Sequence, residues 1–253
     1  MSPALSLLRS LLRGTIRRRI YLTERVPTVS GDYGGRRFDR IGVRTADGLA
    51  IAGLRSAPRS DARYTLLYFH GNGGCAATRA PLVEPLVREG ADVVVADYRG
   101  YGDNPGRPTE AGLMADARAF LDHARATRAG PLVLFGHSLG GAIAIALAAD
   151  DPREVCALIT LGTFASLRAR APAFARDLLP DAFDAAAAAP RVAIPWTILH
   201  ETDDEVTSVA HAHALFEASG APGRVRLRIL TGGSHALDAA KLSAAIHDAL
   251  APA

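Results

Sequence analysis

The chain has 253 residues, of which 49% are hydrophobic and 22% are charged, and its net charge is +3. This length accommodates one large α/β domain or two small ones, and this composition excludes wholesale disorder. Six arginines and one glutamate give residues 1–25 a charge of +5, so the remainder carries −2 and does not favour nucleic acid binding.

Residues 1–25 are a basic amphipathic segment preceding a main domain that we expect over residues 26–253. Within residues 5–22, hydrophobic side chains recur every four positions and arginines form a parallel stripe. Because the arginines interrupt the hydrophobic run, a secretory signal is not indicated. One interpretation is an interfacial helix that makes peripheral membrane contact through residues 1–22. The other, which we favour, is a helix packed on the domain or a frayed terminus.

The two cysteines, Cys75 and Cys156, are far apart and form no Cys-x-x-Cys pair or Cys/His cluster. A disulfide framework is therefore not indicated, and a reducing compartment fits better. We expect a cytoplasmic protein, with membrane association as the alternative, and neither a metal nor a cofactor.

The next elements are a hairpin and then a regular alternation. Residues 38–45 and 50–56 have strand composition and flank Asp47-Gly48, which is typical of a hairpin turn. After residue 64, strand-like runs alternate with helical stretches. The strands are expected at 65–69, 92–96, 132–135, 157–161, 197–199 and 225–230, and the helices at 79–89, 109–125, 138–149, 209–218 and 239–250. This alternation predicts an α/β fold with a mostly parallel central sheet and helices on both faces.

One interval breaks the alternation. Residues 164–190 separate two expected strands and are longer than a usual connection. They contain scattered hydrophobic residues, two prolines and an alanine run. We favour a small helical cap, because the interval also lies next to the strand ends where ligand groups gather. The alternative is a helical crossover with an irregular start.

Residues 132–141 read Leu-Val-Leu-Phe-Gly-His-Ser-Leu-Gly-Gly and combine a short hydrophobic strand, a glycine-flanked turn and the start of an alanine-rich helix. This is the context of a nucleophile elbow, in which a serine is raised at the end of a sheet. Ser138 is therefore the candidate nucleophile. A serine hydroxyl also needs a base, an acid that orients the base, and donors for an oxyanion.

The candidate base is His235, in a glycine-containing loop directly after the last expected strand. It follows the nucleophile in the order Ser, Asp or Glu, His that this kind of elbow uses. His70 and His200 also end strands, and we interpret both as structural. His137 adjoins the nucleophile but should point away from it.

The candidate acid lies in residues 200–206, directly after another expected strand. Four acidic residues compete there, and spacing alone favours Asp203 or Asp204 without choosing between them. Asp97 also ends a strand, but it precedes the nucleophile. We interpret Asp97 as a structural charge paired with Arg99.

Two backbone N–H groups are expected to form the oxyanion hole, one directly after the nucleophile and one after an earlier strand. The first is that of Leu139. The second is that of Asn72, in the run His-Gly-Asn-Gly-Gly at residues 70–74. This run lacks the lysine of a phosphate-binding loop, so nucleotide binding is not indicated.

Taken together, these motifs resemble the α/β-hydrolase superfamily, and more narrowly its Bem46-like and ABHD-like serine hydrolases. Five blocks in order carry the resemblance, over about residues 38–250: residues 70–74, 97–102, 136–141, 200–206 and 232–235. The family pattern around the acid is His-Gly-x-x-Asp, and this resemblance prefers Asp204. Three departures are Glu201 in place of glycine, Thr207-Ser208 in place of Val-Pro, and Asn104 in place of serine.

The sequence thus predicts a serine hydrolase that cleaves a carboxylic ester or related acyl bond through Ser138, His235 and Asp204, without a cofactor. The expected substrate is a small acyl or lipid-like molecule. One alternative is an aminopeptidase, amidase or acyl-protein thioesterase, which differs in the bond it cleaves. Another is an inactive binding protein on the same fold. The oligomeric state is not indicated.

Overall fold

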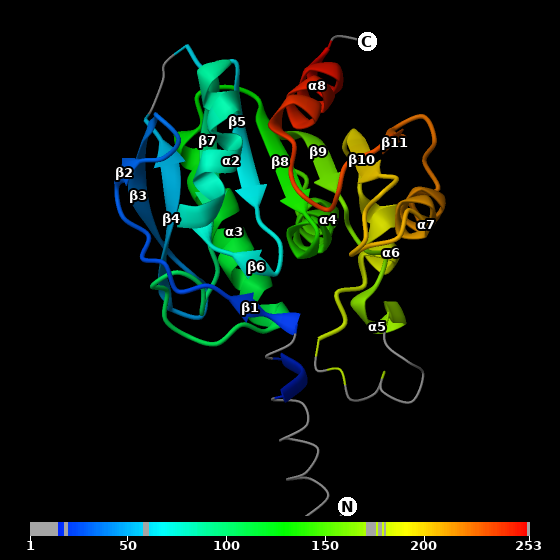
Figure 1. Cartoon of the computed structure of the whole chain (residues 1–253), viewed down its shortest axis with the longest axis horizontal. Coiled ribbons are helices and arrows are strands. Elements are labelled where there is room, and N and C mark those ends of the chain that lie inside the picture. The colour runs from blue at the N-terminus through cyan, green and yellow to red at the C-terminus, as the bar shows by residue number, and fades with distance from the viewer. Residues whose placement is uncertain are drawn as a thin grey trace, which may run out of the picture.

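The computed structural model describes residues 15–17, 20–57, 61–170, 176, 179 and 181–251. Within this part of the chain, nine strands form one sheet in the order β11-β10-β9-β8-β5-β7-β4-β3-β2, and β1 and β6 form a separate pair. The strands from β11 to β7 are parallel, whereas β4, β3 and β2 continue the sheet in antiparallel pairing. Figure 1 shows the sheet with its helices. The predicted α/β fold with a mostly parallel sheet is confirmed.

The strands are β1 (Leu22–Thr23), β2 (Gly31–Asp32), β3 (Arg37–Arg44), β4 (Ala50–Ser56), β5 (Tyr64–Phe69), β6 (Gly73–Gly74), β7 (Ala91–Ala96), β8 (Leu132–His137), β9 (Val155–Leu161), β10 (Trp196–Glu201) and β11 (Val225–Leu230). The helices are α2 (Ala76–Arg88), α3 (Glu110–Thr127), α4 (Leu139–Asp150), α5 (Leu167–Arg170), α6 (Ala185–Ala188), the short 3₁₀ helix η2 (Ala189–Arg191), α7 (Ala210–Ser219) and α8 (Ala239–Leu250).

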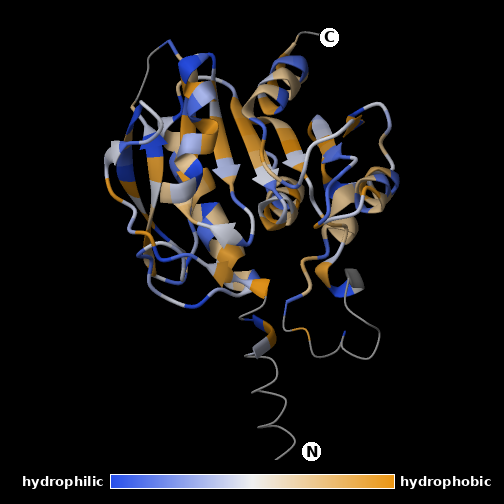
Figure 2. Ribbon diagram, viewed as in Figure 1, coloured by the Kyte–Doolittle hydropathy of each residue, from blue (hydrophilic) through white to orange (hydrophobic). Residues whose placement is uncertain are grey.

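Two hydrophobic layers enclose the sheet. Helices α2 and α8 pack on one face, and α3, α4 and α7 pack on the other. The central strands β5, β7 and β8 are buried along their whole length because both faces are covered. Figure 2, which is coloured by hydropathy, shows β8 largely in orange, as expected of a strand buried on both faces. Because these strands are parallel, the segments that follow them meet at one edge of the sheet.

The expected hairpin is confirmed. Strands β3 and β4 pair antiparallel from Phe38 and Ser56 down to Arg44 and Ala50. Gly48 takes a φ of 86° in the connecting turn, a conformation that glycine adopts without strain.

Two predictions fall partly outside the described residues. The amphipathic helix was expected over residues 5–22, of which only 15–17 and 20–22 are described. Of the expected cap, residues 171–175, 177, 178 and 180 are outside; the described part includes α5, α6 and η2, and α6 packs against α4 and α7. No helix within the described ranges has the length and apolarity needed to cross a bilayer.

Candidate active site

Ser138 lies at the turn between β8 and α4, with φ 54° and ψ −116°. A positive φ is uncommon outside glycine and costs about 1–3 kcal/mol, so the surroundings must impose it. The Ser138 N–H donates to the Leu161 carbonyl at 2.9 Å, and a Cβ atom on Gly140 would collide with the Phe69 carbonyl. Strands β9 and β5 therefore fix this turn, whose geometry is that of a nucleophile elbow.

Asp204 and His235 are brought into direct contact. His235 Nδ1 lies 2.7 Å from Asp204 Oδ2, and the Asp204 side chain is only 1% exposed. The other carboxylate oxygen accepts the backbone N–H groups of Val206 at 2.9 Å and Thr207 at 2.7 Å. Burial acts to raise the pKa of Asp204, but the bonds from His235, Thr207 and Val206 outweigh it and the pKa is lowered. The carboxylate is thus kept ionised beside the imidazole.

Asp203 has a different environment. It is exposed, and its carboxylate accepts only the Thr202 hydroxyl, at 3.0 Å, in the described contacts. The geometry therefore separates the two aspartates that sequence spacing left open.

His200 contacts two residues of the loop that carries Asp204. Its Nε2 lies 2.7 Å from the Thr207 carbonyl and 3.5 Å from Asp204 Oδ2, and its ring is fully buried. Thr207 thus contacts both residues through its main chain, donating to Asp204 and accepting from His200. These contacts fit the structural interpretation of His200. They also show that Thr207, which replaces the valine of the usual Val-Pro, links both ends of the loop through its main chain.

His137 connects the elbow to the loop of His235, a link that sequence reasoning missed. Its Nε2 lies 2.7 Å from the His235 carbonyl, and the two rings lie 5.0 Å apart. Burial, reinforced by the nearby His235, lowers the pKa of His137 to about 3. His137 is therefore neutral near pH 7, and its Nε2–H donates to the carbonyl.

Within the described part of the chain, no hydrogen bond joins the Ser138 hydroxyl to His235; such bonds often tighten only when substrate is bound.

Glu201, which stands where the family has glycine, forms an ion pair with Lys241 at the start of α8. Lys241 is the only lysine in the chain. Its Nζ lies 2.8 and 3.0 Å from the two Glu201 oxygens, and the Glu201 side chain is 4% exposed. A Cβ atom on Gly233 would lie 2.7 Å from Glu201 Oε2, so the carboxylate lies directly against the loop that carries His235. The glutamate that replaces the family's glycine is thus paired with Lys241, and this ion pair joins the residues before and after the loop of His235.

The run of residues 70–74 lies beside the elbow. A Cβ atom on Gly71 would lie 3.3 Å from Ser138 Cβ. The Gly71 carbonyl is 2.8 Å from His70 Nδ1, which fixes the peptide whose N–H belongs to Asn72. Leu139 begins α4, so its N–H has no carbonyl partner within that helix. Both expected oxyanion donors therefore belong to segments next to Ser138.

Asp97 supports this loop, and the expected pairing with Arg99 is wrong. Asp97 Oδ1 lies 3.1 Å from His70 Nε2, and its Oδ2 accepts the Ala76 N–H at 3.0 Å. Arg99 instead contacts Asp116 at 2.8 Å and Asp47 at 2.7 Å. The sequence predicted a structural charge at Asp97 but could not show which partner it meets.

Asn104 also has a structural role. Its side-chain oxygen accepts the Ala52 N–H at 2.7 Å and its amide nitrogen donates to the Ala52 carbonyl at 2.9 Å. Asn104 offers its acceptor and its donor on two separate atoms, whereas a serine at this position would have to make both contacts with strand β4 from one shorter hydroxyl. No group of three side chains that could hold a metal ion occurs among the described residues.

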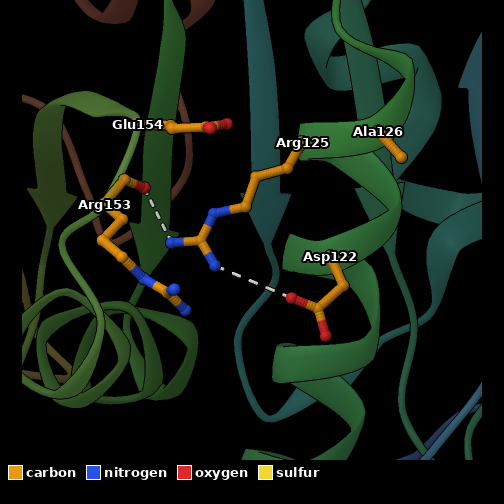
Figure 3. A pocket seen from close by; sticks show the side chains of 5 residues that line it. All are labelled: Asp122, Arg125, Ala126, Arg153 and Glu154. Carbon is orange, nitrogen blue, oxygen red and sulfur yellow. Dashed lines mark hydrogen bonds and ion pairs between the residues drawn. The ribbon is translucent and has the colours of Figure 1, made fainter.

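A pocket of about 410 Å³ lies at the end of the sheet opposite to Ser138, between α3 and the start of β9 (Figure 3). Arg125 in its wall donates to the Arg153 carbonyl at 2.7 Å and contacts Asp151 at 2.8 Å. Arg153 pairs with the same aspartate at 2.8 Å. This pocket is separate from Ser138, and its charges already have partners.

Comparison with known proteins shows relatives of this chain. The model of a family described as serine aminopeptidase, S33, matches residues 60–180. Protein bem46 of Schizosaccharomyces pombe is 33% identical over 153 residues, which cover 58% of this chain and 48% of that protein. The uncharacterized protein YfhR of Escherichia coli is 31% identical over 191 residues, covering 71% of this chain and 66% of YfhR.

Solved structures show the same fold. An esterase of Pyrococcus furiosus, Pf2001, superposes with a TM-score of 0.72 at 16% identity and covers 91% of this chain and 98% of its own. A protein of Thermus thermophilus, TT1662, superposes with a TM-score of 0.64 at 20% identity over 90% of this chain and 100% of its own. The chain belongs to the α/β-hydrolase superfamily. Within it, the chain is similar to the Bem46-like proteins, and it spans about half to two thirds of the length of these curated relatives.

Proposed function

We propose that the chain is a serine hydrolase that cleaves a carboxylic ester or related acyl bond. The observation that carries the proposal is the 2.7 Å contact between His235 Nδ1 and the buried Asp204 carboxylate. The loop of His235 is linked through His137 to the strained turn of Ser138. An acid that holds a histidine by Nδ1 leaves Nε2 available as a base, which is the arrangement that activates a serine hydroxyl. The family of the chain and its esterase neighbours in fold support the same class of reaction.

In this proposal Ser138 Oγ attacks the carbonyl carbon while His235 takes the hydroxyl proton. The N–H groups of Asn72 and Leu139 stabilise the oxyanion, and one such donor contributes about 10²–10³ in rate in related sites. His235 then protonates the leaving alcohol as the bond to it breaks, which leaves an acyl group on Ser138. A water molecule, deprotonated by His235, attacks this ester, and His235 returns the proton to Ser138 Oγ as its bond to the acyl carbon breaks and the carboxylic acid leaves. The lowered pKa of Asp204 keeps its charge available to stabilise the imidazolium in both steps.

A second candidate is cleavage of an amide bond, which the description of the matching family as serine aminopeptidases favours. The machinery would be the same, because His235 can protonate an amine as it protonates an alcohol. A thioester of a lipidated protein is a third kind of bond open to this chemistry. Turnover of p-nitrophenyl esters of increasing chain length, measured beside aminoacyl amides and an acyl thioester, separates the three bond types.

The class of reaction is tested with a fluorophosphonate probe, which reacts with activated serines. We expect the wild-type chain to be labelled and Ser138→Ala to be unlabelled, while Ser234→Ala, which removes another serine near the site, is labelled like the wild type. No labelling of the native wild-type chain would contradict the proposal and favour an inactive binding protein on this fold.

A further inference from the structure

The segment that enters the fold from the N-terminus lies along the oxyanion loop. Strand β1 (Leu22–Thr23) pairs in parallel with β6 (Gly73–Gly74), with Leu22 opposite Gly73. Figure 1 shows this pair at the end of the sheet toward which β5 runs. No sequence pattern predicts this contact, because each of the two strands is only two residues long.

Asn72 is held by this segment at two points. Its carbonyl accepts the Leu22 N–H at 3.0 Å, and its side-chain amide donates to the Ile20 carbonyl at 3.2 Å. The Tyr101 hydroxyl donates to the same Asn72 carbonyl at 2.9 Å. Since His70 fixes the peptide that precedes Asn72, the peptides on both sides of this residue are fixed. The direction of the Asn72 N–H is therefore set jointly by His70, Tyr101 and the N-terminal segment.

The N-terminal segment is itself anchored on both sides of β1. Tyr21 is 4% exposed and its ring packs edge-on against Phe183, with centroids 6.3 Å apart. After β1, the Glu24 carbonyl accepts the Gly102 N–H at 2.8 Å, and the Glu24 carboxylate accepts the Thr78 hydroxyl at 3.0 Å. These contacts make residues 20–24 a fixed support.

We infer that residues 20–24 are a positioning element of the oxyanion hole, acting through the Leu22 N–H on the carbonyl of Asn72. The inference rests on the proposed function, since it gives the Asn72 N–H a role in the transition state. A donor that has moved by a fraction of an ångström stabilises the oxyanion less, while the ground-state ester is bound as before. Loss of the support should therefore lower kcat and leave KM nearly unchanged.

The test compares Leu22→Pro with Leu22→Ala in the full-length chain. Leu22 is 56% exposed, so both variants remove little packing, and only proline removes the N–H. We expect kcat of the proline variant to be roughly tenfold below that of the alanine variant, which is less than the loss of about 10²–10³ expected when a whole donor is removed. A boronic acid, which forms a tetrahedral adduct with the serine, should bind more weakly by a similar factor.

Tyr101→Phe provides a second, independent route to the same carbonyl. It removes the other donor to Asn72 and keeps the ring, so it should also lower kcat with little change in KM. A lower melting temperature with unchanged kcat in both Leu22→Pro and Tyr101→Phe would overturn the inference and leave a purely structural role. Failure of the proposed function is distinguishable, because the wild type itself would then not react with a fluorophosphonate.

Discussion

The two sides of the candidate site are held by different kinds of interaction. His235 is held mainly by side chains: the Asp204 carboxylate, the His137 ring, and the Glu201–Lys241 pair beside its loop. Asn72, on the oxyanion side, is fixed mainly through its backbone carbonyl, which accepts from Leu22 and Tyr101. The histidine side should therefore respond to changes of charge and pH, and the oxyanion side to changes in the backbone that supports it.

The largest expected effect on the histidine side comes from Asp204→Asn. An amide in place of the carboxylate favours the wrong tautomer of His235, and we expect kcat to fall by about 10⁴, the size of this effect in related triads. The matched control is Asp203→Asn, which removes the neighbouring exposed charge and should change kcat by less than about threefold. Steady-state kinetics on one p-nitrophenyl ester measures kcat of both variants. Equal losses of kcat in the two variants would contradict the assignment of Asp204 as the residue that orients His235.

A smaller effect is expected at Lys241, whose removal leaves Glu201 buried without its ion pair. Lys241→Met should lower the free energy of unfolding by about 1–2 kcal/mol, a value reduced because the lysine is one third exposed. It should also lower kcat/KM several-fold by loosening the loop of His235.

Lys241→Arg is the control for this change, since it keeps the charge and should retain most of both quantities. Chemical denaturation and ester kinetics give the two readouts. If methionine and arginine behave alike, the ion pair has no part in placing His235.

The third prediction concerns pH and His137. Its pKa is about 3 in the folded chain and near 6.5 when unfolded, so the unfolded state binds a proton that the folded state does not. This contribution to stability is full above about pH 6.5 and is lost progressively as the pH falls toward 3. Urea unfolding should show a smaller loss between pH 7 and pH 5 for His137→Gln, which cannot take up the proton, than for the wild type. An identical loss would mean that His137 does not titrate in this way.

The smallest expected effect on turnover lies in the basic N-terminal segment. If residues 1–22 contact membranes, Arg9→Gln with Arg13→Gln should weaken binding to anionic vesicles, since each arginine contributes about 1 kcal/mol near such a surface. Turnover of a soluble ester should stay within about twofold of the wild type, because Arg9 and Arg13 precede residues 20–24, which support Asn72. Sedimentation with vesicles that contain phosphatidylserine measures the binding, and unchanged binding would remove the membrane interpretation.

The part of the site that could be predicted is the part encoded in local pattern. The strand, turn and helix around Ser138 lie within one short run, and the order of the motifs indicated His235 and a carboxylate after β10. Spacing could not choose between Asp203 and Asp204, because the choice depends on which carboxylate the folded loop buries. The contacts of Leu22 with Asn72, of Asp97 with His70 and of Lys241 with Glu201 join residues 27 to 50 positions apart. Such pairs leave no periodicity in the sequence and are visible only once the chain has folded.

The central claim, an activated Ser138 with Asp204 and His235 as its partners, is tested most directly by locating a fluorophosphonate adduct by mass spectrometry. The account predicts one adduct per native chain, on the peptide that contains Ser138, with a labelling rate that falls sharply in Asp204→Asn and stays near the wild-type value in Asp203→Asn. An adduct on another serine, no adduct, or a rate that does not depend on Asp204 would contradict it.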